Sequence, residues 1–287
     1  MAIEEYRAPA SLADALTCLR GGDYTVLAGG TDLMPQVHAG RVKFGRGLLN
    51  ITRIDTLHAI ERLGSTIRIG ALVTMTELMN DPLVREHFPV LAEACDHFAS
   101  DQLRNAATLG GNVCNASPAG DTLVPLLVHD AVAELASKPD GRIETRNLPL
   151  AEFFVGPGRT MRAPHELLCA LRLPLPAPGF TARFCKFGTR PALDISAVAI
   201  GVGGVRRGGA LIRARVAYGA VAPMPMRAYR TEQALEGSML GADTSARVAG
   251  VARDEVRPID DVRASAWYRR ELVYNLTRRM LDDVAQA

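Results

Sequence analysis

The sequence has few aromatic residues, almost no net charge and no long apolar run. Phe, Trp and Tyr make up only 5% of its 287 residues. Its 33 basic and 31 acidic residues leave a formal net charge of +2, which gives no electrostatic basis for binding nucleic acid. Apolar stretches such as residues 195–205 reach about half the length that a bilayer-spanning helix needs. The N-terminal Met-Ala-Ile-Glu-Glu has no signal-peptide pattern, so we expect a cytoplasmic protein without a membrane span.

Cysteines and histidines are also few, and their spacing suits no metal site. The five cysteines form no CxxC or CxxxC motif, and the six histidines show no ligand spacing. Zinc and iron–sulfur sites usually draw on such local pairs. We therefore expect free thiols and no metal on this chain. The cysteines are Cys18, Cys95, Cys114, Cys169 and Cys185.

A proline-rich segment divides the chain. Residues 174–179 read Pro-Leu-Pro-Ala-Pro-Gly, which is typical of an extended spacer, and the chain length favours about two domains. Upstream, short strands alternate with short helices, and residues 82–98 are predicted as one helix that begins at Pro82. Downstream, three strands precede three helices, which predicts an α+β unit with an antiparallel three-stranded sheet. The downstream elements are strands 180–188, 196–205 and 210–220 and helices 229–236, 244–255 and 264–285.

Two short Gly-Gly segments are suited to bind phosphate through the main chain. Residues 26–33 read Val-Leu-Ala-Gly-Gly-Thr-Asp-Leu, and residues 108–112 read Thr-Leu-Gly-Gly-Asn. Glycine lets a ligand approach the backbone closely, and successive exposed N–H groups form an anion-binding nest. Neither segment is a Walker A loop or a GxGxxG motif, so the folds that carry those motifs are excluded. Each segment alone is more typical of a structural turn. Together, and with the segment that follows the second one, the two favour a pair of nests that hold the two phosphates of a pyrophosphate.

An acidic residue follows the second Gly-Gly segment. Residues 115–121 read Asn-Ala-Ser-Pro-Ala-Gly-Asp, and Asp121 precedes a predicted helix over residues 122–129. Aspartate is a common helix N-cap, which would give Asp121 a purely structural role. Its carboxylate also suits hydrogen bonds from ligand hydroxyls, such as those of a ribityl chain. Both roles are open on the residues alone.

The segments over residues 28–33 and 107–121 resemble a known family, the flavin-binding medium subunits of the molybdenum hydroxylases. This group includes xanthine dehydrogenase, carbon monoxide dehydrogenase and bacterial nicotine or aldehyde dehydrogenases. The resemblance covers nearly the whole chain. Further similar segments are residues 153–158, 166–174, 184–190 and 194–196.

The resemblance implies an α+β fold in two parts. A PCMH-type (vanillyl-alcohol-oxidase-like) FAD-binding domain of two lobes would occupy residues 1–175. A smaller C-terminal domain with the three-stranded sheet would occupy residues 179–287. Residues 26–33 would wrap the diphosphate of FAD, and residues 108–112 would complete the cradle.

The same resemblance implies a wider set of FAD contacts. Phe98 and Leu168 would pack on the two faces of the adenine, Asp121 would hold the ribityl or pyrophosphate side, and Lys186 would face the flavin. The full set is Val26, Leu27, Ala28, Gly29, Gly30, Thr31, Asp32, Leu33, Phe98, Ala107, Thr108, Gly110, Gly111, Asn112, Asn115, Gly120, Asp121, Leu168 and Lys186. A Gly110→Val/Gly111→Val variant is expected to lose FAD while keeping its fold, because the added Cβ groups block the phosphates.

The implied function is electron transfer inside a larger oxidoreductase. A large subunit would hold the molybdenum cofactor and a small subunit two [2Fe–2S] clusters, in a dimer of heterotrimers. This chain would pass electrons from those clusters through FAD to NAD⁺, a quinone or another acceptor. No catalytic residue is implied on this chain, because the redox chemistry belongs to the cofactor. Some relatives carry a [4Fe–4S] cluster on this subunit, but the cysteines here are too few and too dispersed to bind one.

Two other functions fit parts of the pattern. A stand-alone FAD oxidoreductase with the same domain would need a proton donor of its own, and the sequence shows no obvious one. A scaffold subunit that has lost FAD would not need the intact Gly29-Gly30 and Gly110-Gly111 pairs.

Overall fold

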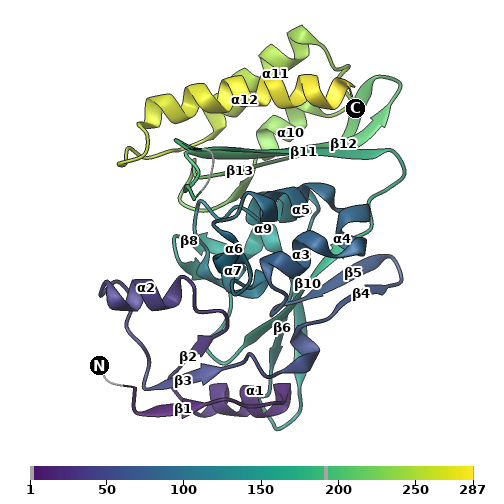
Figure 1. Ribbon diagram of the computed structural model, residues 1–287. Helices are drawn as coiled ribbons and strands as arrows, with labels where there is room; N and C mark the ends of the chain where they lie inside the picture. The colour runs from purple at the N-terminus through teal and green to yellow at the C-terminus, as the bar shows by residue number, and fades with distance from the viewer. Residues whose placement is uncertain (1–2, 191–192, 287) are drawn as a thin grey trace.

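Three apolar cores, each built around one β-sheet, are stacked along the molecule (Figure 1). The computed structural model describes residues 3–190 and 193–286, and the main sheets within this part have three, five and four strands. A two-stranded ribbon of β8 (Phe154–Gly156) and β9 (Arg159–Thr160) lies beside them. The two larger sheets are antiparallel and helices cover their faces, which confirms the predicted α+β class.

The first lobe is a small parallel sheet in the order β1-β3-β2. Its strands are β1 (Glu5–Arg7), β2 (Tyr24–Leu27) and β3 (Gly47–Asn50). Helix α1 (Leu12–Gly21) connects β1 to β2 and buries Leu16 against this sheet. The chain leaves β2 through residues 28–32 and enters the short helix α2 (Leu33–His38), so the first Gly-Gly segment lies at the carboxyl end of a parallel strand.

The second lobe is an antiparallel sheet in the order β4-β5-β10-β6-β7, and its central strand β10 joins the two lobes. Leu167 and Cys169 of β10 pack into the core of the first lobe, whereas Leu168 packs into the core of the second. This alternation follows from the period of two residues in a strand. The strands are β4 (Ile60–Leu63), β5 (Thr66–Gly70), β6 (Val132–Ser137), β7 (Glu144–Pro149) and β10 (Leu167–Pro174).

A cluster of short helices lies above this sheet, and one of them corrects the prediction for residues 82–98. Two helices, α4 (Pro82–His87) and α5 (Pro89–Asp96), occupy that stretch and meet at Phe88. Proline at position 89 has no N–H and disfavours helical geometry in the residue before it, so the helix restarts there. The remaining short helices are α3 (Met75–Asn80), α6 (Asp101–Arg104), α7 (Leu109–Asn115), α8 (Leu123–Val128), α9 (Leu150–Phe153) and the 3₁₀ turn η1 (Asp55–Leu57).

The C-terminal part is an antiparallel sheet with helices α10 (Tyr229–Leu235), α11 (Ala242–Glu255) and α12 (Ala266–Gln286) on one face (Figure 1). The three predicted strands are present, and the two-residue strand β14 pairs with β13 to add a fourth. No helix among the described residues combines the length and the apolar character needed to cross a membrane. The strands are β11 (Phe180–Phe187), β12 (Val198–Arg207), β13 (Ala210–Gly219) and β14 (Met226–Arg227).

Helix α8 packs on the other face of this C-terminal sheet, and all six of its residues are buried. Glycines in β12 make the close approach possible. A Cβ atom at Gly201 would lie 2.8 Å from Cγ2 of Val128, and a Cβ at Gly203 would lie 2.8 Å from Cγ1 of the same valine. The absence of side chains at these two positions therefore sets how closely the two parts of the chain pack.

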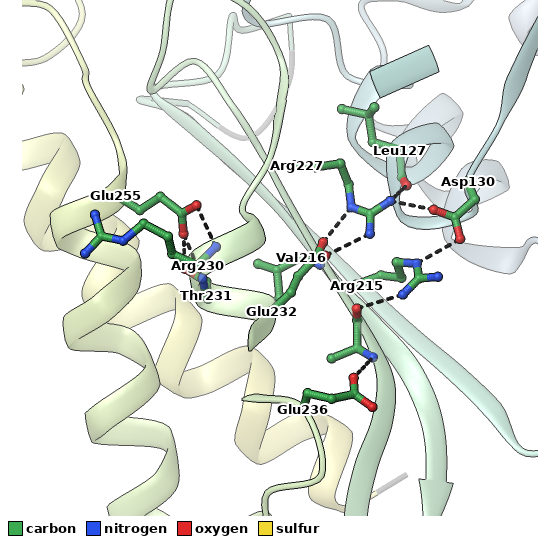
Figure 2. A network of polar contacts seen from close by, with 11 residues as sticks. Leu127, Asp130, Arg215, Val216, Arg227, Arg230, Thr231, Glu232, Glu236 and Glu255 are labelled. Carbon is green, nitrogen blue, oxygen red and sulfur yellow. Dashed lines mark hydrogen bonds and ion pairs between the residues drawn. The ribbon is translucent and has the colours of Figure 1, made fainter. Parts of the chain in front are cut away.

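Asp130, just after α8, is bound by two arginines of the C-terminal sheet (Figure 2). Arg215 Nε donates to Asp130 Oδ2 at 2.8 Å, and Arg227 Nη1 donates to Asp130 Oδ1 at 2.5 Å and to the Leu127 carbonyl at 3.2 Å. Arg227 also makes a paired contact with Glu232 at 2.5 and 2.9 Å. This network fixes the end of α8 to the C-terminal part.

His129, the residue after α8, is a buried histidine without a partner for Nε2. Its ring packs between Phe88 and Phe180, with ring centroids 4.9 and 5.3 Å away. Burial disfavours the imidazolium, and it lowers the pKa of His129 from 6.5 to about 4. A histidine with a lowered pKa stabilises the fold above its unfolded-state pKa, and this stability is lost as the pH falls toward the folded-state value.

We therefore expect a His129→Phe variant to be less sensitive to acid than the wild type. Between pH 6.5 and pH 4, the wild type should lose about 3 kcal/mol of unfolding free energy that the variant keeps. Urea unfolding at several pH values measures this difference. His38→Gln, at an exposed histidine that ends α2, should keep the wild-type slope. An identical slope for His129→Phe would contradict the assignment.

Candidate functional site

A cavity of about 460 Å³ lies between the first lobe and helix α7. Most of the sequence-predicted contacts line it, although they come from segments far apart in the chain. Its size is within the range of small-molecule and cofactor sites. The predicted residues in its wall are Val26, Ala28, Gly29, Gly30, Thr31, Asp32, Leu33, Phe98, Ala107, Thr108, Gly110, Gly111, Asn112, Asn115 and Leu168.

Four predicted residues do not line this cavity. Leu27 is the last residue of β2, and its side chain lies beside Gly30, where an added Cβ would be 3.0 Å from Leu27 Cδ1. Gly120 is buried in a turn, where its N–H donates to the Ser117 carbonyl at 3.0 Å. The remaining two, Asp121 and Lys186, are paired with each other.

The first Gly-Gly turn offers unpaired main-chain donors to the cavity. Within the described residues, the N–H groups of residues 29–32 donate to no protein acceptor. Gly30 has φ +70°, which favours glycine, and a Cβ at Gly29 would lie only 1.8 Å from the Ala106 carbonyl oxygen. The turn is therefore pressed against the main chain of residue 106 while its own donors remain free. This arrangement matches an anion-binding nest.

The second Gly-Gly segment lines the cavity, and its contact with a cofactor stays a prediction, but its main-chain donors are not free. Gly110 N–H donates to the Ala71 carbonyl at 2.8 Å, Gly111 N–H to Thr108 Oγ1 at 3.1 Å and Asn112 N–H to the Thr108 carbonyl at 3.0 Å. Thr108 caps helix α7, and the donors expected to form a second nest are already bonded. The prediction of free donors at residues 110–112 is wrong, because these glycines form the first turn of a helix.

The expected behaviour of the double valine variant changes for the same reason. A Cβ at Gly110 would lie 2.6 Å from the Ala71 Cβ and 2.8 Å from its carbonyl oxygen. These are packing contacts inside the lobe, so Gly110→Val disturbs the fold itself. Loss of a ligand in that variant would not identify a phosphate contact.

Gln36 and Arg162 of the cavity wall were not predicted from the sequence. Gln36 Nε2 donates to Asp32 Oδ2 and, at 3.2 Å, to Asn115 Oδ1, so it links α2 to the end of α7. The spacing of four residues between Asp32 and Gln36 on a helix was the available signal. Arg162 lies on the loop before β10, and nothing in its local sequence distinguishes it.

Arg162 and Asp32 are the two charged side chains that line the cavity. Arg162 Nη1 is anchored by the carbonyls of Ala163 and Glu166 at 3.1 and 2.7 Å. Burial raises the pKa of the nearby Cys114 thiol, and the charge of Arg162 partly opposes that rise. The wall thus offers an anchored cation, free N–H donors and apolar surface. This donor set fits a dinucleotide with a diphosphate and an aromatic base. The other lining residues are Tyr24, Thr25, Val42, Ile51, Ala71, Cys114 and Leu167.

Asp121 and Lys186 form a buried ion pair between the two parts of the chain. Lys186 Nζ lies 2.7 Å from Asp121 Oδ2 and also donates to the His97 carbonyl at 2.9 Å. Ser196 Oγ donates to the second Asp121 oxygen at 2.9 Å. Burial raises the pKa of Asp121, and Lys186 opposes this rise. Lys186 also lines a second hollow of about 370 Å³ with residues 187–190.

The described residues contain no group of three or more His, Cys, Asp or Glu that could hold a metal ion. All five cysteines are free thiols. Cys95 and Cys169 are buried in apolar cores, and burial raises the pKa of Cys169 to about 12. A thiol with so high a pKa is not a ready nucleophile or metal ligand at neutral pH.

The sequence matches two protein families along most of its length. Residues 2–176 match the family described as "FAD binding domain in molybdopterin dehydrogenase", and residues 183–284 match "CO dehydrogenase flavoprotein C-terminal domain". The chain is 31% identical over 285 residues to the xanthine dehydrogenase FAD-binding subunit of Escherichia coli O157:H7, with 98% of this chain and 96% of that protein covered. It is 30% identical over 276 residues to the glyceraldehyde dehydrogenase medium chain of Sulfolobus acidocaldarius, with 96% of each covered.

A solved structure shares this fold almost from end to end. It is the carbon monoxide dehydrogenase of Hydrogenophaga pseudoflava in a form that lacks the Mo-pyranopterin moiety of the molybdenum cofactor. The TM-score is 0.92 at 30% identity, with 98% of this chain and 96% of that chain covered. The expected two-part fold is confirmed.

Breaking the Asp121–Lys186 pair should destabilise the fold in a pH-dependent way. Lys186→Met leaves a buried carboxylate without its cation, which typically costs about 3–5 kcal/mol near neutral pH. The loss raises the pKa of Asp121 further. A raised carboxyl pKa contributes stability at low pH that is lost as the pH rises, so the destabilisation should be larger at pH 8 than at pH 5.

Denaturant unfolding at the two pH values measures this effect. An Asp121→Asn/Lys186→Met variant serves as the control, because it has no buried charge at either position and should recover much of the loss at pH 8. An equal destabilisation by Lys186→Met at both pH values would refute a charge-pairing role.

Proposed function

Because the chain belongs to the family of FAD-binding subunits of molybdopterin dehydrogenases, we propose that it holds FAD in the cavity between its first lobe and α7 and relays electrons inside a larger oxidoreductase. The observation that carries this proposal is the turn over residues 29–32, whose unpaired donors face a cavity with one anchored cation. The two matched families together extend over residues 2–176 and 183–284, which supports a boundary between the two domains near the proline-rich residues 174–179.

The residues of this chain bind and orient the cofactor. The N–H groups of residues 29–32 hold the diphosphate, and Arg162 offsets part of its charge. Phe98 and Leu168 give apolar contact to the adenine. FAD, when bound, supplies redox chemistry that accepts electrons singly and releases them in pairs. No residue of this chain is required as an acid or a base for that transfer.

Asp121 and Lys186 remain in this proposal as polar contacts toward the ribityl and ring portion of FAD. Lys186 Nζ has three donor hydrogens, and two are directed to Asp121 and the His97 carbonyl. One donor is left for a ligand atom. The carboxylate of Asp121 accepts one bond at each oxygen and has lone pairs left for ligand hydroxyls.

The proposed partners are a large subunit with the molybdenum cofactor and a small subunit with two [2Fe–2S] clusters, assembled as a dimer of heterotrimers. Electrons would enter from the clusters and leave to NAD⁺, a quinone or another acceptor. Relatives named as medium chains or FAD subunits support a multi-chain assembly. We place the assembly in the cytoplasm, which the five free thiols favour.

Co-expression with the neighbouring genes and purification through a tag on this chain tests the function. We expect two further chains, molybdenum, iron and FAD to co-purify, and the electron-donating substrate of the complex to bleach the flavin absorption by reducing FAD. The isolated chain with FAD should not be bleached by that substrate. Bleaching of the isolated chain would instead support a stand-alone oxidoreductase, and a complex without flavin would support a scaffold.

Arg162→Leu should weaken FAD binding about tenfold, because one charge-assisted contact to a diphosphate is lost. The dissociation constant is measured by quenching of flavin fluorescence on the apoprotein, at low and high salt. The wild-type affinity should fall more steeply with salt than that of the variant. Arg142→Leu, at an exposed arginine, should bind FAD as the wild type does. Equal affinity for Arg162→Leu would remove this residue from the site.

A further inference from the structure

Helix α2 carries the turn that faces the cavity, yet it is weakly attached to the rest of the fold. None of its residues is buried, and Figure 1 shows it at the edge of the molecule, away from the strands of the first lobe. An element without buried apolar contacts lies at the low-stability end of a structure. The contact of Gly29 with the main chain of residue 106 holds the start of the turn, so the position of the rest of the turn and of α2 depends on the few polar contacts that hold α2.

Gln36 makes the side-chain contact between α2 and the opposite wall. Its Nε2 donates to Asn115 Oδ1 at 3.2 Å, and Asn115 is the last residue of α7. The same amide donates to Asp32 Oδ2 at the start of α2. The Gln36 main-chain carbonyl separately accepts from the N–H of Arg41 at 2.9 Å, so the backbone at the end of α2 does not depend on the side chain.

Asp32 gives this contact a second consequence. Asp32 is the last residue of the turn whose N–H groups are proposed to hold a diphosphate. A negative charge on its carboxylate, without a donor, would repel that diphosphate. The Gln36 amide donor engages this carboxylate and ties it to the α7 side of the cavity. The Gln36 side chain thus connects the two walls of the cavity, and it also hydrogen-bonds to the carboxylate beside the proposed phosphate site.

We propose that Gln36 is a positioning residue that latches the turn over residues 29–32 onto α7 and thereby slows the release of FAD. This inference rests on the proposed function, because it assigns a role in holding the same cofactor. Gln36 touches no reacting atom in this account, and it acts through Asp32 and Asn115. FAD release requires the latch to open, as lid segments do in other cofactor sites.

Loss of the latch should accelerate release without unfolding the protein. Gln36→Leu in the FAD-loaded protein removes both amide contacts, and the release rate should rise about tenfold. Release is followed as the rise in flavin fluorescence after high dilution of the FAD-loaded protein into buffer without FAD. The melting temperature of the apoprotein should stay within about 2 °C of the wild type. Gln102→Leu, at an exposed glutamine of α6, is the matched control and should release FAD at the wild-type rate.

Asn115→Ala provides a second variant that removes the partner and leaves Gln36 in place. The two residues act as one unit, so Gln36→Leu/Asn115→Ala should release FAD no faster than the faster single variant, within about twofold. Multiplicative effects of the two substitutions would show that they act independently, which would overturn the latch.

Gln36→Glu tests whether the hydrogen-bond donor of Gln36, and not only the size of its side chain, slows the release of FAD. At pH 8 the new carboxylate has no donor and is repelled by Asp32, so release should be at least as fast as in Gln36→Leu. At pH 5 a growing protonated fraction restores one O–H donor, and release should slow toward the wild-type rate. The wild type and Gln36→Leu should not show this slowing.

Two outcomes distinguish failure of the latch from failure of the function. A wild type that retains FAD and releases it at the same rate as Gln36→Leu overturns the latch and leaves the FAD function intact. A folded wild type that never takes up FAD overturns both.

Pulse-labelled hydrogen exchange of α2 in the FAD-bound protein should show faster exchange in Gln36→Leu, as an independent check of the opening.

Discussion

The main chain of the first Gly-Gly turn lies directly against the main chain of residue 106, and the cavity depends on this contact. A Cβ at Gly29 would lie 1.8 Å from the Ala106 carbonyl oxygen, so no other residue can occupy position 29 without moving one of the two segments. The contact brings the first lobe beside α7 while it leaves the N–H groups of residues 29–32 without protein acceptors. Free donors are costly in a closed interior, and here they face a cavity.

Helix α8 connects the N-terminal lobes to the C-terminal part of the chain. An aspartate stands before it and another after it, and each is bound by basic residues of the C-terminal sheet: Asp121 by Lys186, and Asp130 by Arg215 and Arg227. Glycines in β12 let the helix pack closely on that sheet. The two parts are therefore joined by an apolar contact with an ion pair at each end. Such a joint holds the second part in a fixed place beside the proposed cofactor site.

Local patterns predicted most of the fold, because caps, strand periodicity and turn residues act over short distances. The three long strands after residue 179 and the helices that follow them are where the sequence indicated. Tertiary packing decided what local patterns could not. The sequence around Gly110 and Gly111 resembles a phosphate nest. In the structure, however, the Gly110 N–H donates to the carbonyl of Ala71, which is distant in sequence. The Gly111 N–H donates to the side chain of Thr108, which caps the helix. Proline at position 89 restarts a helix that periodicity alone would continue.

The residues of the cavity wall show the same limit of prediction from local sequence. Fifteen of the predicted contacts lie in its wall, and the resemblance of their motifs to a known family made them predictable. Gln36 was marked only by its spacing of four residues from Asp32, and no local signal marks Arg162. Hydrogen exchange of the apoprotein and the FAD-bound protein tests the central claim most directly. The amides of residues 29–32 should exchange fast without FAD and become protected with it, while those of residues 110–112 should be protected in both states. Fast exchange at residues 29–32 in the FAD-bound protein would contradict the account.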